Sequence, residues 1–292
     1  MSSRNKKGIV CVIASAIVFG MMPLITKTAY ALGANAYMAA LGRFFFGSIM
    51  LFVLCRIKKK NVVINKKEMK NMILVSLPYS FVPVTLYISY NYIGSGLATT
   101  LHFTYPILVV LLSVFFLNKK ITLKQNICEV IGFAGILLLS SNSKYGSLAG
   151  ITIAILSGLL YAVYITSLDK ITTNSIDELV LSFWVSVISF VIISIVTLFT
   201  NNFVITGDYR VTLLFIVLGL LATAFGLRLF QKGVFLCGPI KASLLSTLEP
   251  ITGILLGMYF FNERIEIGEL IGILLILVSA CIVVLPDKKK QK

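Results

Sequence analysis

Long apolar runs separated by short polar segments extend along the whole chain. A helix that crosses about 30 Å of hydrocarbon needs about 20 predominantly apolar residues, and nearly all of the runs approach that length. The pattern therefore predicts an all-α membrane protein with ten transmembrane helices. They are placed at Gly8–Thr28, Ala36–Cys55, Asn71–Asn91, Gly96–Leu117, Ile127–Ser141, Leu148–Leu168, Leu179–Phe199, Val211–Phe230, Ile240–Phe261 and Ile265–Leu285.

Composition supports the bilayer as the solvent for this chain. Of its 292 residues 58% are hydrophobic and 13% are charged, whereas soluble domains average about 45–50% and about 25%. This excess is too large for one soluble core. Since the connections between runs are short, no inserted soluble domain is expected.

The distribution of Lys and Arg predicts the orientation, because basic residues concentrate in cytoplasmic loops. With the N-terminus in the cytoplasm, twenty of the 26 Lys and Arg residues lie on the cytoplasmic side and four on the outer side. We therefore expect a multi-pass protein of the cytoplasmic membrane, surrounded by lipid, with both termini cytoplasmic. This arrangement also explains the net charge of +15 without a nucleic-acid partner.

Motifs for metals, cofactors and catalysis are missing from the sequence. The five cysteines form no CxxC pair, and one histidine cannot make an HExxH site. There is no P-loop for ATP. We expect no metal, no cofactor and no catalytic residues, and therefore not an enzyme.

An internal repeat relates the two halves of the chain. The segment Gly94–Asn118 matches Gly238–Asn262 at a fixed offset, which pairs Tyr105-Pro106 with Glu249-Pro250. Five helices in each unit would insert the second unit upside down, and inverted repeats are typical of transporters. We predict one unit at residues 1–145 and the other at 146–292, joined in one transmembrane body.

These paired motifs, together with Arg43-Phe44 in the second span, resemble the EamA-type family of the drug/metabolite transporter superfamily. The resemblance covers nearly the whole chain. It implies a ten-helix fold and the export or uptake of small solutes. The chain departs from a fully paired motif at Tyr105, which stands where the second copy has Glu249.

Two ionisable residues inside spans are candidates for a substrate site, because such groups are costly in a membrane and usually face a cavity or a partner. Arg43 would bind a carboxylate or phosphate of the solute. Glu249 would bind an amine or carry a coupling proton. The alternative for Arg43 is a structural bridge to a helix end or to Glu249, and for Glu249 it is a helix-packing hydrogen bond.

Further candidates come from His102 and the aromatic residues of the spans. A proton relay at His102 and a pairing within the bundle are both open, as are cavity lining and core packing for the aromatic residues. Prolines remove a backbone donor and predict bent or broken helices. The complete set of substrate-site candidates is Arg43, Tyr79, His102, Tyr105, Tyr161, Trp184 and Glu249, with helix breaks at Pro78, Pro83, Pro106 and Pro250.

The sequence thus predicts a secondary transporter that exports a small solute by alternating access. An amino-acid-like solute is favoured, because Arg43 and Glu249 offer opposite charges to a zwitterion. Transport would be coupled to a proton or solute gradient or to none. The alternatives are a structural or assembly subunit of the membrane and an intramembrane enzyme.

Overall fold

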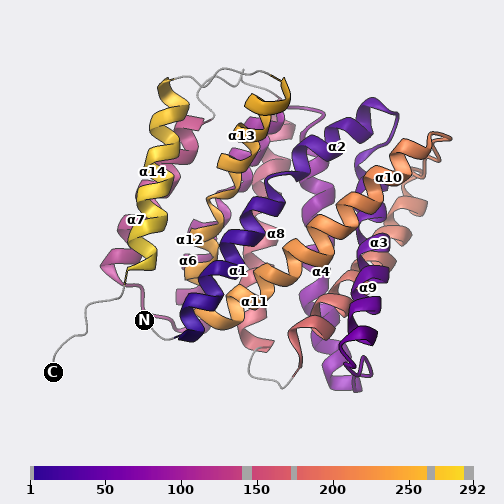
Figure 1. The fold of residues 1–292 in the computed structure, drawn as a ribbon, viewed down its shortest axis with the longest axis horizontal. Coiled ribbons are helices and arrows are strands. Elements are labelled where there is room, and N and C mark those ends of the chain that lie inside the picture. Colours follow the sequence, from indigo (N-terminus) through magenta and orange to yellow (C-terminus); the bar gives the residue numbers. More distant parts are fainter. Residues whose placement is uncertain (1–2, 140–146, 172–175, 262–266, 286–292) are drawn as a thin grey trace.

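The computed structural model describes residues 3–139, 147–171, 176–261 and 267–285, and in these residues every regular element is a helix. Figure 1 shows the helices gathered in one bundle, in which the first described helix begins and the last one ends at the same end. Helices are expected here because hydrocarbon cannot satisfy backbone polar groups, so each segment must pair its own. The boundary predicted at residues 145 and 146 lies outside the described residues.

Within residues 3–139, the described part of the first half, there are seven helices. They are α1 (Ser3–Phe19), α2 (Met22–Ala31), α3 (Ala36–Ile57), α4 (Lys66–Ser89), α5 (Ser95–His102), α6 (Tyr105–Leu117) and α7 (Leu123–Leu139).

The second half contains eight elements, one of which is a π-helix. They are α8 (Leu148–Ile171), α9 (Glu178–Phe199), α10 (Tyr209–Leu218), the π-helix η1 (Gly219–Leu227), α11 (Arg228–Cys237), α12 (Pro239–Ser246), α13 (Glu249–Phe261) and α14 (Ile267–Val284).

Seven helical stretches in the described residues are long and apolar enough to cross a membrane. They are Ser3–Ala31, Ala36–Ile57, Lys66–Ser89, Leu97–Leu117, Leu148–Asp169, Glu178–Phe199 and Tyr209–Cys237. The protein is therefore a multi-pass membrane protein, as predicted. The other three predicted spans fall on α7, on α12 with α13, and on α14.

Polar residues at the loop ends start several of these helices. The Asn35 side chain accepts the Met38 N–H at the start of α3, and Asp177 accepts the Leu179 N–H at the start of α9. Asn65 and Glu68 form a reciprocal capping box at the start of α4. Such caps satisfy N–H groups that the first turn leaves without partners, so each helix begins at a defined residue.

Three of the predicted spans are interrupted near prolines. The chain breaks between α1 and α2 just before Pro23, between α5 and α6 just before Pro106, and between α12 and α13 just before Pro250. By contrast, α4 is continuous through Pro78 and Pro83. It packs against α8 and α9, and neighbouring helices allow prolines inside a membrane helix.

The packing of the helices repeats between the halves. Helix α4 packs on α8, and α11, its counterpart in the repeat, packs on α1. The pairs α3 with α9 and α7 with α14 each join equivalent helices, and Figure 1 shows the second pair at one side of the bundle. Each of these contacts between the halves is thus either repeated at the equivalent position or made between two equivalent helices.

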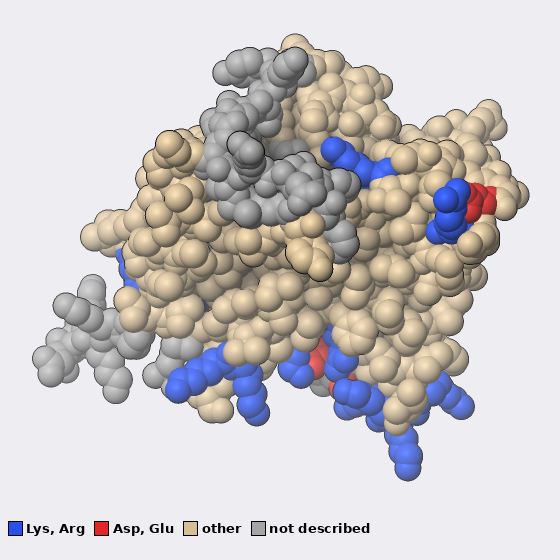
Figure 2. Space-filling model, turned by 45° about the horizontal axis from the view of Figure 1, so that its top comes forward, with Lys and Arg blue, Asp and Glu red and all other residues tan. Residues whose placement is uncertain are grey.

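Basic residues collect at one end of the bundle, as Figure 2 shows along its lower edge. Three ion pairs join loops and helix ends there, namely Lys60–Asp177, Lys119–Asp169 and Lys232–Glu178, each at 2.7 Å. At the opposite end Arg210 pairs with Asp208 at 2.6 Å. The two ends of the molecule therefore differ strongly in charge.

Candidate functional site

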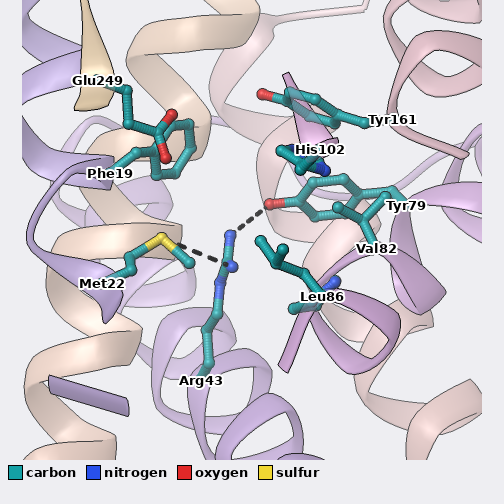
Figure 3. Close-up of a pocket in the computed structure, with 10 residues that line it drawn as sticks. Phe19, Met22, Arg43, Tyr79, Val82, Leu86, His102, Tyr161 and Glu249 are labelled. Carbon is teal, nitrogen blue, oxygen red and sulfur yellow. Dashed lines mark hydrogen bonds between the residues drawn. The ribbon is translucent and has the colours of Figure 1, made fainter. Parts of the chain in front are cut away.

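A small cavity of about 40 Å³ lies where both halves of the bundle meet. It is large enough to hold water and small beside the pockets of about 300–1,000 Å³ that bind drug-sized ligands. Figure 3 shows the side chains that surround it. Its lining consists of Phe19, Met22, Arg43, Tyr79, Val82, Pro83, Leu86, His102, Tyr161 and Glu249.

Larger hollows, of about 270 and 310 Å³, lie elsewhere on the bundle. Their walls are mainly apolar side chains of α6, α7 and α8, many of them exposed, as expected for surfaces that contact lipid tails. The small cavity is the better site, because it combines charged, aromatic and hydroxyl groups from several helices.

Arg43 of α3 is buried, with 3% of its surface exposed. Its Nη2 donates to the Tyr79 hydroxyl at 2.7 Å, and its Nε donates to Thr223 Oγ1 at 3.2 Å. Nη1 donates to the sulfur of Met22, at 3.8 Å. No carboxylate lies within ion-pair distance of Arg43 in the described part of the chain. A buried cation is thus held by neutral acceptors alone.

The faces of three aromatic rings partly compensate for the lack of an anionic partner around Arg43. Its Cζ lies 5.9 Å from the ring centroid of Phe19, 5.6 Å from that of Phe44 and 5.9 Å from that of Tyr79. Each such contact contributes about 0.5–2 kcal/mol. The rings stabilise the guanidinium without neutralising its charge.

Glu249 begins α13 at the interruption that precedes Pro250. Its carboxylate points into the cavity beside Phe19 and on the far side from the base of Arg43 (Figure 3). The described residues provide it with neither a hydrogen bond nor an ion pair. The site therefore presents one cation and one anion that do not bond to each other.

His102 ends α5 at the other interruption, and its Nδ1 lies 2.8 Å from Ser157 Oγ. The Ser157 hydroxyl donates to the Ala154 carbonyl at 2.6 Å, so its oxygen accepts from His102. A neutral imidazole with its proton on Nδ1 keeps Nε2 as an acceptor. His102 is thus paired within the bundle and still lines the cavity.

Tyrosines form a continuous aromatic wall along one side of the cavity. The Tyr161 ring stacks on His102 at 5.5 Å and on Tyr164 at 5.9 Å, and Tyr164 lies 4.4 Å from Tyr79. Tyr164 also accepts a hydrogen bond from Gln231 Nε2 at 2.7 Å. The wall joins α4, α5 and α8 and is rigidly packed.

Five of the seven predicted substrate-site residues line this cavity: Arg43, Tyr79, His102, Tyr161 and Glu249. Tyr105 packs behind Tyr161, and its hydroxyl bonds to Ser246. The structure does not bring Trp184 to the cavity, because its indole N–H donates to the Val62 carbonyl at 2.8 Å at the charged end of the bundle.

Of the four predicted helix breaks, Pro106 and Pro250 each lie next to an interruption, beside His102 and Glu249 respectively. Pro83 lines the cavity from the unbroken helix α4, which also contains Pro78. α4 is therefore unbroken at these two prolines, and the alternative of a bent helix stays a prediction.

Sequence reasoning missed Phe19, Met22, Val82 and Leu86 as lining residues, and Thr223 as a partner of Arg43. Gly20 and Pro23 flank the interruption in the first span, and this pair was a usable signal for Phe19 and Met22. Val82, Leu86 and Thr223 carry no such signal, because apolar and hydroxyl residues are common in every span.

These features define a multi-pass helical membrane protein with an internal charged site between two related halves. The sequence model of the EamA-like transporter family matches this chain twice, at residues 6–141 and 148–285. The chain belongs to this family. The family and the names of its relatives indicate a membrane transporter rather than an enzyme.

Relatives and a solved structure extend this result. The uncharacterized transporter YvbV of Bacillus subtilis is 25% identical over 94% of this chain and 90% of its own. Protein PagO of Salmonella typhimurium is 26% identical over 81% and 82%. A crystal structure of 13% identity superposes with a TM-score of 0.81 over 96% of both chains, which shows the same fold.

Proposed function

We propose that the protein is a secondary transporter that exports a small amino-acid-like zwitterion across the cytoplasmic membrane. It crosses the membrane ten times as two inverted five-helix repeats, with both termini in the cytoplasm. Alternating access would come from movement of the two halves around the cavity.

Two features support the inverted repeat. The family's sequence model matches each half separately, and the contacts between the halves recur in equivalent positions, α4 with α8 matching α11 with α1. If α7, α12 with α13, and α14 also cross, each half has five crossings. An odd number turns the second half upside down relative to the first.

The observation that carries the solute class is the uncompensated charge of Arg43. Leaving a buried charge without an ionic partner is costly. This guanidinium lines the cavity, and its Nη1 donates there to a thioether sulfur at 3.8 Å. A carboxylate accepts from such a group in a bidentate manner. A solute carboxylate would therefore complete the site.

Glu249 provides the complementary half of the proposal. Its carboxylate has no partner in the described residues, so the ammonium group of the solute would bind it. The same carboxylate could exchange a proton during the cycle, which makes Glu249 the residue to test for coupling. An assembly subunit would need neither charge at a cavity.

Transport by purified protein in lipid vesicles tests this function. Vesicles would be preloaded with each of the twenty standard amino acids, and counterflow of the labelled amino acid measured. We expect Arg43→Ala and Glu249→Gln each to lower apparent affinity by about 10- to 150-fold, the value of about 1.5–3 kcal/mol for a hydrogen bond to a charged group.

Matched controls are available in the chain. Arg210→Ala removes an arginine from an exposed position, and Glu68→Gln keeps the capping box of α4 while removing its charge. Both should transport like wild type. Transport of no amino acid, or undiminished transport by both cavity variants, would overturn the proposed solute class. Release of the labelled amino acid from vesicles of known protein orientation decides the direction of transport. Proton coupling would be identified by a transport rate that depends on the pH gradient in wild type and not in Glu249→Gln.

A further inference from the structure

A π-helix packs behind Arg43, one of the residues that line the cavity. The 29-residue stretch Tyr209–Cys237 is one helix whose middle nine residues, Gly219–Leu227, are π-helical. Segments of this kind are rare and are frequently found at functional sites, and each inserts extra backbone that shifts the register of the residues after it. One residue of register rotates side chains by about 100°, so the π-helix decides which side chains face α3.

Thr223 is the residue that the π-helix presents to Arg43. It is fully buried, accepts from Arg43 Nε at 3.2 Å and lies 3.4 Å from the Arg43 carbonyl oxygen, to which its hydroxyl can donate. A Cβ on Gly47 would lie 2.5 Å from Thr223 Cβ, and a Cβ on Gly219 would lie 2.6 Å from the backbone nitrogen of Gly47. The two helices are thus fixed in close contact at this point.

The same segment also supports the aromatic side of the site. The Ser15 hydroxyl donates to the Gly226 carbonyl at 3.0 Å, and a Cβ on Gly226 would lie 2.7 Å from the Phe19 ring. The π-helix therefore holds α1 as well as α3, and it positions both Phe19 and Arg43.

The hydrogen bonds of Arg43 are divided between the two halves of the molecule. A guanidinium has five N–H donors, one on Nε and two on each Nη. Thr223 of the second half takes the donor on Nε, Tyr79 of the first half takes one on Nη2, and the Met22 sulfur of the first half takes one on Nη1 at 3.8 Å. The edge formed by Nη1 and Nη2 is the one that faces the cavity (Figure 3).

We propose that Thr223 is a positioning residue that occupies the Nε edge of Arg43, so that a solute must bind the Nη1–Nη2 edge. This edge suits a planar group with two oxygens, such as a carboxylate, bound end-on. A carboxylate in that position replaces the sulfur of Met22 and competes with Tyr79. The inference rests on the proposed function and adds the basis of its selectivity.

The test compares Thr223→Val, which keeps the shape and removes the hydroxyl, with Thr223→Ser, which keeps the hydroxyl. Counterflow of the twenty amino acids is measured as above. We expect Thr223→Val to raise KM about tenfold for the transported amino acid with little change in maximal rate, and Thr223→Ser to stay near wild type.

A double-mutant cycle shows whether Thr223 acts through Arg43. Lysine has no Nε–H of this kind, so Thr223→Val should have no further effect on KM in an Arg43→Lys protein. Equal KM values for Thr223→Val and wild type, equal losses in the Val and Ser variants, or independent effects in the cycle would each overturn the proposal.

The outcome also separates this inference from the proposed function. If wild type moves no amino acid, the solute class is wrong and the role of Thr223 falls with it. If wild type transports and Thr223→Val is unaffected, only the inference about Thr223 fails. For the transported amino acid, its aminophosphonate analogue should bind more weakly, because its headgroup is tetrahedral. Equal binding of the analogue would contradict end-on selection.

Discussion

At the scale of single residues, charged side chains form ion pairs at the ends of the bundle, whereas the two that face the cavity do not. Arg43 and Glu249 face the cavity without forming an ion pair, whereas Asp177 and Lys60 pair at 2.7 Å at the basic end. Asp177 also caps α9. Burial by itself raises the pKa of Asp177. Hydrogen bonds from Lys60 and from the Leu179 N–H together lower the pKa by more than burial raises it, so the pKa of Asp177 is below its ordinary value.

This shift predicts an acid-sensitive contribution to stability. A carboxyl whose pKa is lower in the folded protein stabilises the fold above its unfolded pKa, and the contribution is lost as the pH falls through the folded pKa. Wild type should therefore lose thermal stability between about pH 5 and pH 2. Asp177→Asn can still cap the helix but cannot ionise, so its melting temperature should depend less on pH in that range. Parallel pH curves for the two proteins would contradict this.

Residue types were sufficient to predict the ionisable part of the site. Arg43, His102 and Glu249 were identified because ionisable groups at membrane depth are rare and costly, and all three line the cavity. Tyrosines and Trp184 could not be ranked in the same way, because an aromatic ring suits a core, an interface and a cavity equally well. Their substrate-binding roles stay predictions, and Trp184 has its partner elsewhere.

At the scale of helices, glycines set how closely α3 and η1 approach. Gly47 and Gly219 lie where their added Cβ atoms would be 2.5 and 2.6 Å from atoms of the facing helix. Contacts this short cannot exist, so a side chain at either position would separate the two helices and move Thr223 from Arg43.

Gly47→Ala should therefore destabilise the protein by about 1–3 kcal/mol and weaken solute binding. Gly207→Ala is the matched control, since its added Cβ would meet no atom within 4 Å, and it should change stability by less than about 0.5 kcal/mol. Thermal unfolding of both variants in the same detergent measures the difference. Equal melting temperatures would show that the two helices separate without cost.

The interruptions show what a helix-scale reading of proline can and cannot predict. Pro106 and Pro250 are next to real breaks, but α4 is unbroken at Pro78 and Pro83. The local chemistry of all four is the same, since each lacks a backbone donor. Pro106 and Pro250 each stand in the first turn of a helix, where no N–H is needed, whereas Pro78 and Pro83 lie inside α4. Proline identity by itself does not distinguish these two positions.

At the scale of the whole molecule, the unequal charge of the two ends determines the orientation we propose. Loops that contain Lys60 and Lys119 meet helix ends that contain Asp177 and Asp169 at the basic end. Basic residues favour the cytoplasmic side, so this end would face the cytoplasm.

Cysteine labelling in intact cells checks this orientation. In a variant without the five native cysteines, Gly207→Cys should react with a membrane-impermeant maleimide. Lys67→Cys, also exposed, should react only after the cells are permeabilised. The reverse pattern would invert the proposed topology, and labelling of both positions would contradict the assignment of the loops to opposite sides.

The sequence by itself determined that the chain is helical, that it belongs in a bilayer, that its halves are related and that Arg43, His102 and Glu249 are the ionisable groups of interest. Hydrophobic length, charge placement and the cost of burying a charge are properties of a segment and can be read from it. Only the tertiary structure decided that the cavity is small, that α4 stays whole, that Trp184 lies outside the site and that a π-helix places Thr223 on Arg43. These features depend on which helix packs on which, and residues 180 positions apart, such as Arg43 and Thr223, have no local pattern that records their contact.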